Sequence, residues 1–522
     1  MKRAAKKWTT VFLAFVMAVL MNPTAGQKVN AATDTTYTFQ QMTYASSYGL
    51  TYSVSGGALT VNFQGQYKEI KYNLPNTVSM VGCTSIKIDI KSDEGNTAIK
   101  FYDTGGKEAF VKYNCYSSRQ NYTLVPSDGQ TIGAIGVMSQ DTADYSATVY
   151  SVTFTLDSGS SGSAETLKSA YSPIFGKVGV AVTLPQLQAS ATLDFIKSQY
   201  NSITMENEMK PDALLGSSPT LLSVNQAQQN GYIIPNGYTE TYVPAIHYSN
   251  LDTVLGIAAS NGLGLRFHTL IWHNQTPAWF FRTGYSGNTY VSSDVMDKRV
   301  EYYVKNVLAH VYSGSYGQVV YAWDIANEYF HNTDNGTCHW TQIYGNEGNS
   351  PAYIKKAFQY ASDMLTSYGV RGNVSLFYND YNTYMIASDI VSLISYINSG
   401  TDYCDGVGMQ SHLDVNWPSP SYVGQAVQTF MDAGLEIQLT EVDVTLNAQQ
   451  SGYTLADQAA YYDDLMEMLI TKKKAGGDIS GITFWGLYDS VSWRASGQPL
   501  LFTGINQPKQ AYYSVIQAAS LY

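Results

Sequence analysis

The chain is poor in cysteine and in charged residues. Its 522 residues include four cysteines, and 14% of them are charged against 44% that are hydrophobic. So few cysteines exclude a disulfide framework, and the stability of so long a chain must come from large apolar cores in two or three units. Cys83 and Cys115 lie early and Cys338 and Cys404 late, so one bridge per domain and free buried thiols both fit the sequence.

Long hydrophobic runs are missing beyond the first 31 residues. Near the start, four basic residues precede an apolar run from Trp8 to Met21, and a small-residue cleavage pattern ends at Ala31. This pattern predicts a secretory signal peptide over residues 1–31. The alternative, a membrane anchor, would need about 20 apolar residues, whereas this run has fourteen. We therefore expect a secreted, extracellular protein with no membrane span after cleavage, and association with the cell surface stays open.

Positive charge is scarce as well. The formal net charge is −11, and it moves to −16 without residues 1–31, which carry five positive charges and no negative one. Such acidity excludes nucleic acid and anionic membranes as partners and favours a neutral one. Aromatic residues are plentiful, with 43 Tyr, 18 Phe and 8 Trp, and aromatic faces stack well on the apolar faces of sugar rings. Core packing must account for most of them.

The sequence also lacks metal-binding patterns. Its seven histidines form no HExxH motif. The segment from His331 to Trp340 is loosely similar to the start of a calcium loop, but it lacks the spaced acidic residues, so a loop on the substrate side is the better interpretation. We expect neither a metal nor another cofactor.

Short alternating segments occupy the first part of the chain after residue 31. They run over Leu59 to Phe63, Ile86 to Ile90, Ala98 to Asp103 and Ala147 to Leu156, with turn residues at Gly56-Gly57, Asp93 to Gly95 and Asp128-Gly129. Regularly spaced short strands predict an all-β sandwich over residues 36–157. The run DSGSSGS comes next and predicts a flexible Gly/Ser linker, assigned to residues 158–166.

From residue 167 to 522 strand-like runs alternate with helical patterns. The expected strands are Lys177 to Val182, Ser202 to Asn207, Leu265 to His273, Val320 to Glu328, Val374 to Asp380, Gly406 to His412, Ile437 to Asp443 and Ile482 to Asp489. Helix-like segments include Met296 to Val311, Ala352 to Tyr368 and Leu455 to Lys474. Eight strands with helices between them predict an α/β fold, a (β/α)₈ TIM barrel, preceded by the all-β sandwich.

Polar residues gather at one end of the expected strands. They are Glu206, His268, Glu328, Asn379, His412, Glu441 and Trp485. In a closed barrel these ends surround one mouth, whereas an open doubly wound sheet would not bring all of them together. Two of them, Glu328 and Glu441, each follow a run of β-branched and apolar residues. Two carboxylates facing each other across a cleft are the minimal equipment for cleaving a glycosidic bond.

Seven segments at these strand ends carry a resemblance to a known family. They are TMENEMK (204–210), HTLIWHNQTPAW (268–279), WDIANE (323–328), LFYNDYN (376–382), GVGMQSHL (406–413), TEVDV (440–444) and WGLYDSVSWR (485–494). In this order they are similar to glycoside hydrolase family 10, the endo-β-1,4-xylanases, and the resemblance covers the barrel domain from end to end.

The resemblance implies roles for the residues around the two glutamates. Glu328 would be the general acid/base and Glu441 the nucleophile of a retaining double displacement on internal β-1,4-xylosidic bonds. By similarity to the family, Asn327 would bind the 2-hydroxyl of the sugar being cleaved. His412 and Asp443 would orient Glu441 and keep it charged. A strand-end salt bridge is the alternative for either glutamate taken alone.

The same resemblance names the substrate-binding residues. His268 and Gln410 belong to the subsite of the cleaved sugar, Glu206, Asn207 and Lys210 grip the non-reducing side, and Trp272, Trp485 and Trp493 form an aromatic platform and wall with Gln275 and Tyr381 nearby. Lys210 could instead be an ordinary surface lysine, and Trp272 alone could equally belong to the core. A bulky indole near C5 of the sugar favours xylose over glucose by sterics.

The sandwich domain resembles a carbohydrate-binding module in architecture and position, with families 22 and 86 as candidates. It has no Trp but twelve Tyr between Tyr37 and Tyr150, which could form a stacking groove for a glycan or simply pack its core. The expected partners are xylan and xylo-oligosaccharides, and we expect a monomer. Two rival hypotheses are a retaining β-glucanase of similar barrel fold and a non-catalytic xylan-binding protein.

Overall fold

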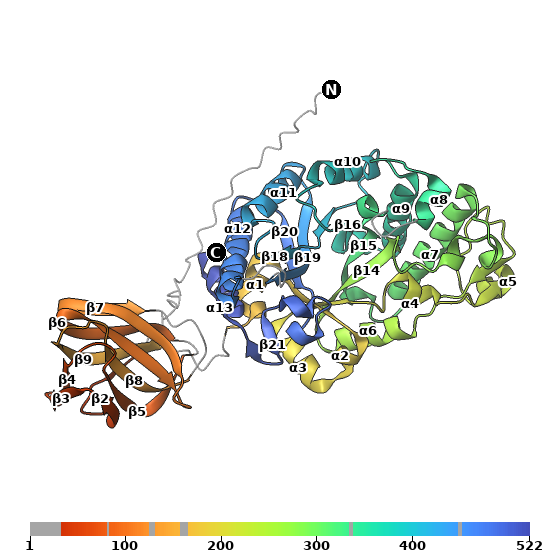
Figure 1. Cartoon of the computed structure of the whole chain (residues 1–522). Coiled ribbons are helices and arrows are strands. Elements are labelled where there is room, and N and C mark those ends of the chain that lie inside the picture. Colours follow the sequence, from red (N-terminus) through yellow and green to blue (C-terminus); the bar gives the residue numbers. More distant parts are fainter. Residues whose placement is uncertain (1–32, 81–82, 125–130, 157–164, 333–337, 447–451) are drawn as a thin grey trace, which may run out of the picture. The chain divides into compact units, whose positions relative to one another are not determined.

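The computed structural model describes residues 33–522 apart from 81–82, 125–130, 157–164, 333–337 and 447–451. It divides into two compact units between Ala164 and Glu165 (Figure 1). The predicted signal peptide, most of the predicted linker, the predicted turn at Asp128-Gly129 and the middle of the segment from His331 to Trp340 lie outside the described residues.

The N-terminal unit is an all-β sandwich of antiparallel strands, as predicted. Its strands are β1 (Thr33–Tyr37), β2 (Thr43–Tyr48), β3 (Leu50–Ser55), β4 (Ala58–Phe63), β5 (Glu69–Ser79), β6 (Cys83–Asp103), β7 (Glu108–Leu124), β8 (Thr131–Ser139) and β9 (Tyr145–Leu156). The strands pair in the order β2-β5-β8-β6-β9-β4-β3, with β1 on β9 and β7 on β6. The alternating inward residues of β4, Leu59, Val61 and Phe63, are fully buried, so this unit has its own apolar core.

One predicted turn in the sandwich is wrong. Asp93 to Gly95 do not separate two strands, because β6 runs through them without a break. The first part of β6, up to Asp93, pairs with β9, and the second part, from Thr97, pairs with β8. The irregular register between Ser92 and Thr97 therefore marks a change of neighbour along one long strand, in which the turn-forming residues are accommodated.

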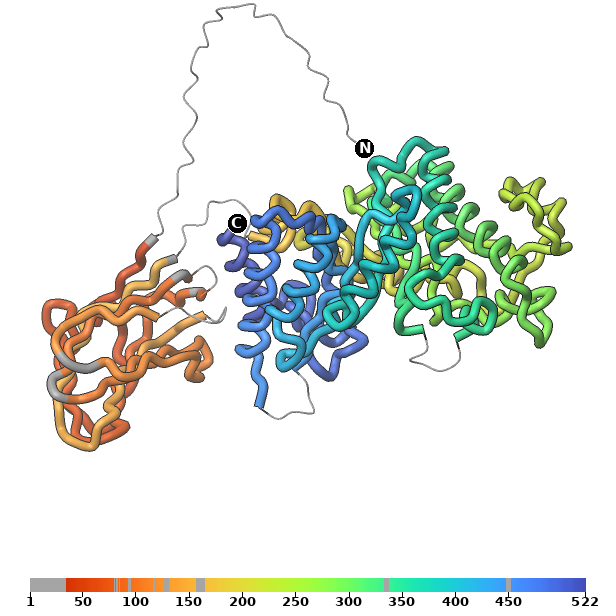
Figure 2. The backbone as a smooth tube through the Cα atoms, turned by 90° about the horizontal axis from the view of Figure 1, so that it is seen from above, coloured from red at the N-terminus to blue at the C-terminus, as the bar shows by residue number. Residues whose placement is uncertain are grey.

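The C-terminal unit is a closed barrel of eight parallel strands, as predicted. They are β10 (Lys177–Val182), β11 (Ser202–Met205), β14 (Gly264–Trp272), β15 (Val320–Asn327), β16 (Ser375–Asp380), β17 (Gly406–Met409), β19 (Glu436–Thr445) and β20 (Ile479–Phe484). Each strand pairs with the next in this order, and β20 pairs with β10 to close the ring. The first and last parts of this unit therefore lie side by side, as the yellow and blue segments do in Figures 1 and 2.

Helices cover the outside of the barrel. They are α1 (Leu167–Phe175), α2 (Leu184–Gln188), α3 (Ser190–Gln199), α4 (Pro211–Leu215), α5 (Val224–Gln229), α6 (Ser249–Ser260), α7 (Ser293–Ser313), α8 (His339–Tyr344), α9 (Ala352–Ser367), α10 (Ala387–Ile397), α11 (Pro420–Asp432), α12 (Leu455–Lys474) and α13 (Gln510–Ala518). The apolar face of α9 is buried through Ile354, Phe358 and Leu365, at helical spacing. Helix α12 begins at a capping box formed by Thr454 and Asp457, so its predicted start at Leu455 is confirmed.

Short strands complete the unit. They are β12 (Leu221–Ser223) with β13 (Tyr242–Pro244), β21 (Phe502–Gly504) with β22 (Gln507–Pro508), and β18 (His412–Asp414), which pairs with the end of β19. All four cysteines are free and buried, one of the two possibilities that the sequence left open. Among the described helices none is both long and apolar enough to cross a membrane.

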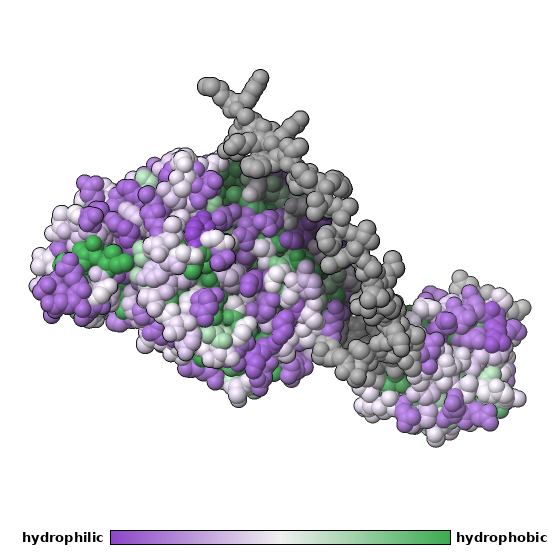
Figure 3. All heavy atoms as spheres, turned by 180° about the vertical axis from the view of Figure 1, so that it is seen from behind, coloured by the Kyte–Doolittle hydropathy of each residue, from purple (hydrophilic) through white to green (hydrophobic). Residues whose placement is uncertain are grey.

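The surface of the barrel unit is mostly hydrophilic to neutral on the face seen in Figure 3, with apolar side chains in scattered patches. Apolar side chains are instead collected in one continuous core between strands and helices. Inside the barrel, however, Arg266 and Asp324 are buried together, and the guanidinium donates to both carboxylate oxygens. Polar groups at this depth are part of the support of the site above them.

Candidate active site

A cavity of about 500 Å³ opens at the carboxyl ends of the barrel strands. It is lined by Glu206, Asn207, Lys210, His268, Trp272, Asn274, Glu328, Tyr381, Asn382, Gln410, His412, Glu441, Trp485 and Trp493. Residues that are far apart in sequence meet there because successive parallel strands deliver their last residues to one rim. The barrel thus brings together both predicted catalytic glutamates and most of the predicted substrate-binding residues.

Glu328 follows β15 directly and has left-handed backbone angles, with φ of 56° and ψ of 38°. Such angles are rare for a non-glycine residue and are tolerated where a function requires the orientation. Here they direct the side chain into the cavity, where Trp272 Nε1 donates to Oε2 over 2.7 Å and Gln410 Nε2 to Oε1 over 2.7 Å. Both carboxylate oxygens therefore have a fixed donor.

The pKa of Glu328 is raised above its ordinary value. Burial is the largest cause, and the nearby carboxylates of Asp380 and Glu441 add to it, while the donors Gln410 and Trp272 oppose it. A carboxyl group with a raised pKa retains its proton at higher pH. Glu328 is therefore suited to give a proton to a leaving group.

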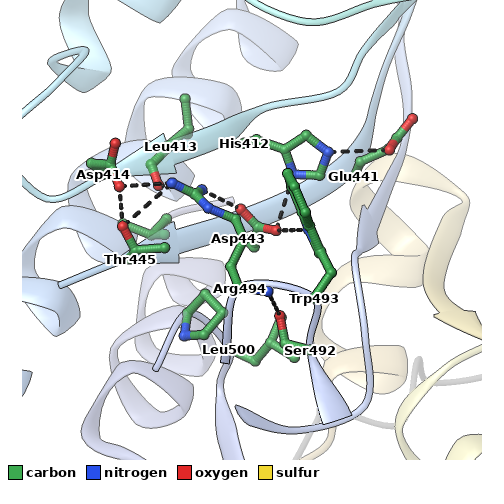
Figure 4. A network of polar contacts seen from close by, with 12 residues as sticks. His412, Leu413, Asp414, Glu441, Asp443, Thr445, Ser492, Trp493, Arg494 and Leu500 are labelled. Carbon is green, nitrogen blue, oxygen red and sulfur yellow. Dashed lines mark hydrogen bonds and ion pairs between the residues drawn. The ribbon is translucent and has the colours of Figure 1, made fainter. Parts of the chain in front are cut away.

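Glu441 lies within β19, and its environment has the opposite effect. Asn379 Nδ2 donates to Oε1 over 2.9 Å. His412 Nε2 lies 3.2 Å from Oε2 (Figure 4). Burial alone would raise the pKa of Glu441, but the hydrogen bond from His412, the charges of His268 and His412 and the donor Asn379 outweigh burial and hold this pKa below its ordinary value. Glu441 is therefore kept ionised and available as a nucleophile.

His412 is the bridge between Glu441 and a second carboxylate. Its Nδ1 lies 3.0 Å from Oδ2 of Asp443, so each ring nitrogen faces a carboxylate. Burial opposes the charged ring, but Asp443 and Glu441 outweigh burial and raise the pKa of His412 to about 10. At neutral pH the ring is an imidazolium, which donates one hydrogen bond to each carboxylate.

Asp443 is held in place from its other side. Arg494 donates to Asp443 Oδ1 over 2.7 Å and to Asp414 Oδ1 over 2.8 Å, and Trp493 Nε1 donates to Asp443 Oδ2 over 3.0 Å (Figure 4). The loop after β20 is thereby tied to β18 and β19. Arg494 thereby orients this loop and presents Trp493, which is 66% exposed, at the lip of the cavity.

The floor of the site rests on the polar core of the barrel. His268 Nδ1 lies 3.0 Å from Asp324 Oδ2, and the same oxygen accepts a hydrogen bond from Arg266 Nε over 3.1 Å. Burial would raise the pKa of Asp324, but Arg266 and His268 outweigh burial and lower it. An ionised Asp324 holds the ring of His268 in place. His268 lines the cavity beside Trp485, and the centroids of these two rings are 5.6 Å apart.

Lys210 and Glu206 form the side of the cavity next to β11. Lys210 is 7% exposed and lies over the ring of Trp272, with Nζ 4.9 Å from the centroid, so it is not an ordinary surface lysine. Burial lowers the pKa of Lys210, and this effect outweighs the nearby carboxylates, which raise it. These are Glu441, Glu328, Asp212 and Glu206. Trp272 itself is partly exposed and lines the cavity, so it does not belong to the core.

Gln275 and Asn327 lie next to the residues that line the cavity but are not part of its lining. The amide of Gln275 donates to Asn207 Oδ1 and to Asp212 Oδ2, each over 3.3 Å, which supports Asn207 from the rear. Asn327 Oδ1 accepts from Asn379 over 2.8 Å. Within the described residues Asn327 Nδ2 is buried without a hydrogen-bond partner, so a donor at the mouth of β15 remains available for a sugar hydroxyl.

Sequence reasoning missed several residues that build the site. The sequence places Asn379 at a strand end without indicating a role, and in the structure it donates to both Asn327 and Glu441. Asn274 and Asn382 line the cavity. The sequence also did not predict the pair of partly buried His331 and buried Asp380, whose Nδ1 and Oδ1 atoms are 2.7 Å apart. The segment NDYN at residues 379–382 carries three of these residues and was the available signal.

Metal chemistry was not expected from the sequence. Among the described residues no group of three or more His, Cys, Asp or Glu side chains could hold a metal ion. The lining of the cavity instead provides two carboxyl groups whose pKa values are shifted in opposite directions, together with amide donors and indole rings, and this set suits a neutral, hydroxyl-rich ligand.

Comparison with known families decides the assignment of this barrel. The model of a family described as Glycosyl hydrolase family 10 matches residues 166–518. The chain belongs to this family. As a family 10 member it is a glycoside hydrolase, and the resemblance stated from the strand-end motifs is confirmed.

Two curated relatives illustrate the match. Endo-1,4-beta-xylanase A of Butyrivibrio fibrisolvens is 43% identical over 354 residues, which are 67% of this chain and 84% of that protein. The bifunctional endo-1,4-beta-xylanase XylA of Ruminococcus flavefaciens is 36% identical over 368 residues, 69% of this chain. The matched region spans 35% of that second protein's length, so much of the latter has no counterpart in this alignment.

A solved structure extends the comparison to the sandwich. It contains the CBM22-1 and GH10 modules of the Clostridium thermocellum endo-1,4-beta-D-xylanase 10B complexed with xylohexaose. This chain is 25% identical to it with a TM-score of 0.56, over 92% of this chain and 95% of that one. Such coverage reaches beyond the family 10 barrel, so the N-terminal unit is like a carbohydrate-binding module in its architecture and position.

Proposed function

We propose that this protein is a secreted endo-1,4-β-xylanase that hydrolyses internal bonds of xylan by a retaining double displacement. The observation that carries the proposal is the opposite pKa shift of two glutamates at one barrel mouth, raised for Glu328 and lowered for Glu441. One group then has a proton to give and the other a negative charge to attack with. The curated relatives are named as endo-xylanases, which supports the substrate.

In the first step Glu441 attacks the anomeric carbon and forms a glycosyl-enzyme ester. The bond to the leaving oxygen breaks, and Glu328 gives that oxygen its proton. In the second step Glu328, now ionised, takes a proton from water while the water oxygen attacks the same carbon and releases Glu441. Two inversions restore the configuration of the sugar.

The residues around the two glutamates act on charge and position. The His412 imidazolium stabilises the Glu441 carboxylate before attack and after release. The free Nδ2 of Asn327 is placed to bind the 2-hydroxyl of the cleaved sugar, a contact that strengthens as the ring becomes oxocarbenium-like. On the side of β11, Glu206, Asn207 and Lys210 are proposed to hold the non-reducing part of the chain.

Xylose is favoured over glucose because indole rings limit the space at the cavity wall. Trp485 is 9% exposed and packs edge-on against His268 and His412, and this packing opposes the displacement that a hydroxymethyl group would require. The test compares release of reducing sugar from xylan and from carboxymethyl cellulose. Faster release from the cellulose would overturn the xylan assignment in favour of a β-glucanase.

A binding protein without catalysis is separated from an enzyme by Glu441→Ala. The variant should lose turnover while it still binds xylan in an affinity gel, because the lost group is the nucleophile and most of the cavity remains. Turnover equal to that of the native protein would contradict the assignment of Glu441.

The sandwich is proposed to bind the same glycan. Among the sandwich residues whose burial the structure describes, five tyrosines are exposed, Tyr44, Tyr48, Tyr52, Tyr67 and Tyr113. The rings of Tyr44 and Tyr52 are stacked, with their centroids 5.5 Å apart. Exposed rings on a rigid sheet suit sugar stacking and would raise the local enzyme concentration on polymer. A fragment of residues 33–157 should be retarded by soluble xylan in an affinity gel, whereas unchanged mobility would favour a spacer.

Secretion rests on the sequence of residues 1–31, which lie outside the described part of the chain. The mature protein should be recovered from the culture medium as a monomer, with an N-terminus close to residue 32. An intact N-terminus on protein that stays inside the cell would contradict the proposal.

A further inference from the structure

An exposed group of aromatic side chains lies beyond one end of the cavity. Trp417 is 52% exposed, and its ring centroid lies 5.3 Å from that of Tyr422 and 6.2 Å from that of Tyr384. Tyr384 and Tyr422 are 5.5 Å apart and only partly exposed. We call these three residues the Trp417 cluster. Among the tryptophans that the structure describes, only Trp417 and Trp493 are exposed, and Trp493 lines the catalytic cavity.

The Trp417 cluster is continuous with the catalytic cavity. Tyr384 Oη donates to Asn382 Oδ1 over 2.7 Å, and Asn382 lines the cavity next to Tyr381. Trp417 follows β18, whose first residue, His412, also lines the cavity. The segment that carries Tyr384 and the segment that carries Trp417 therefore both begin at the cavity wall and lead away from it.

The order of the barrel strands gives the direction of this continuation. Glu206 and Lys210 follow β11, the second strand, and the loop that carries Trp417 follows β17, the sixth. In a ring of eight strands the second and the sixth lie on opposite sides. A linear glycan that is bound with one end over Glu206 and with its middle at Glu328 and Glu441 therefore extends toward the Trp417 cluster.

Trp417 is presented by a loop with a fixed conformation. Asp414 and Trp417 exchange two backbone hydrogen bonds of 3.0 Å each. The side chain of Asp414 accepts from Arg494, which also holds Asp443 (Figure 4). The indole is thus positioned by the same network that supports the nucleophile, and little conformational entropy is lost when a ligand stacks on it.

We infer that the Trp417 cluster is a distal sugar-binding subsite that selects for longer chains. This inference rests on the proposed function, in which the non-reducing part of the chain lies over Glu206, so the cluster takes sugar rings on the reducing side of the cleaved bond. Sugar rings bound at the cluster add binding energy for long substrates, and the cluster does not contact the reacting atoms. Trp417 is a binding residue and not a catalytic one.

The test is Trp417→Ala with xylo-oligosaccharides from xylotriose to xylohexaose. The kcat/KM should be unchanged on the shortest substrate that is cleaved and should fall about tenfold on the longest, which corresponds to one stacked ring. With a label at the reducing end of xylohexaose, the variant should release shorter labelled products, because the bond selected moves toward that end. Trp417→Phe should restore most of the preference for length.

The matched control is Tyr316→Ala. Tyr316 is 47% exposed but lies before β15, at the opposite end of the barrel from the mouth. It should leave kcat/KM unchanged at every length. An equal loss for Trp417→Ala on short and long substrates, or no loss on any, would overturn the subsite while the proposed function stands. Failure of the native enzyme on every xylo-oligosaccharide would instead overturn the proposed function, and the subsite with it.

Discussion

His412 Nε2 lies 3.2 Å from Glu441 Oε2, and His412 Nδ1 lies 3.0 Å from Asp443 Oδ2. One imidazolium is therefore shared between a reacting carboxylate and a structural one. The imidazolium of His412 places a positive charge next to the Glu441 carboxylate. Without it, a carboxylate as buried as Glu441 would be difficult to keep ionised. Among the residues that the structure describes, the hydrogen-bond donors to the Glu328 carboxyl are the neutral side chains of Trp272 and Gln410, and the pKa of Glu328 is raised.

Replacement of His412 should move the acidic limb of the pH profile. Activity requires Glu441 to be ionised, and its lowered pKa places that limb below the ordinary range of glutamate. In His412→Ala the limb should move to higher pH, and kcat should fall about 10²-fold because a donor to the reacting charge is lost. His310→Ala, which breaks a His–Asp pair with Asp252 outside the cavity, should move neither limb. An unshifted acidic limb in His412→Ala would contradict this role.

Replacement of Trp272 should move the alkaline limb. The indole N–H stabilises the ionised form of Glu328 and so lowers its pKa against the effect of burial. In Trp272→Phe that pKa should rise, so the alkaline limb of kcat/KM should move upward, and the rate should fall roughly tenfold through loss of one hydrogen bond to a charged group. The control is Trp279→Phe, which removes a hydrogen bond to Gly216 O instead. A downward shift of the limb would show that the indole stabilises the protonated form.

Asp324 should be needed for stability as well as for activity. Removal of its carboxylate in Asp324→Ala leaves the fully buried Arg266 without its partner, which typically costs about 3–5 kcal/mol in the free energy of unfolding. Asp194→Ala removes an exposed partner of Lys197 and should change that free energy by less than about 0.5 kcal/mol. Urea denaturation of the barrel unit measures both. Equal midpoints for the two variants would contradict the importance of the buried pair.

Much of the barrel could be predicted from the sequence because its strands are buried on both faces. Runs such as Lys177 to Val182 and Val320 to Asn327 are nearly continuous in β-branched and apolar residues, and each is followed by a polar residue at the mouth. The side chains that support the site were harder to predict. Arg266 and Asp324 lie inside such runs, and their partnership across two strands depends on register, which a single sequence does not show.

The sandwich shows a different limit of sequence reasoning. Asp93 to Gly95 has the composition of a turn, yet the strand β6 continues through it because tertiary pairing with β8 and β9 overrides local preference. Tyrosine counts could not separate core from surface either. Tyr72 is 4% exposed and Tyr67 is 66% exposed, although only a short stretch separates them.

The retaining double displacement is tested most directly by recording proton NMR spectra while the native enzyme hydrolyses xylo-oligosaccharides. If Glu441 attacks and Glu328 gives and retrieves the proton, the first anomeric signal to grow is that of the β-anomer of the newly formed reducing end, and the α-anomer appears later by mutarotation. Growth of the α-anomer first would contradict the double displacement and the separate roles of the two glutamates.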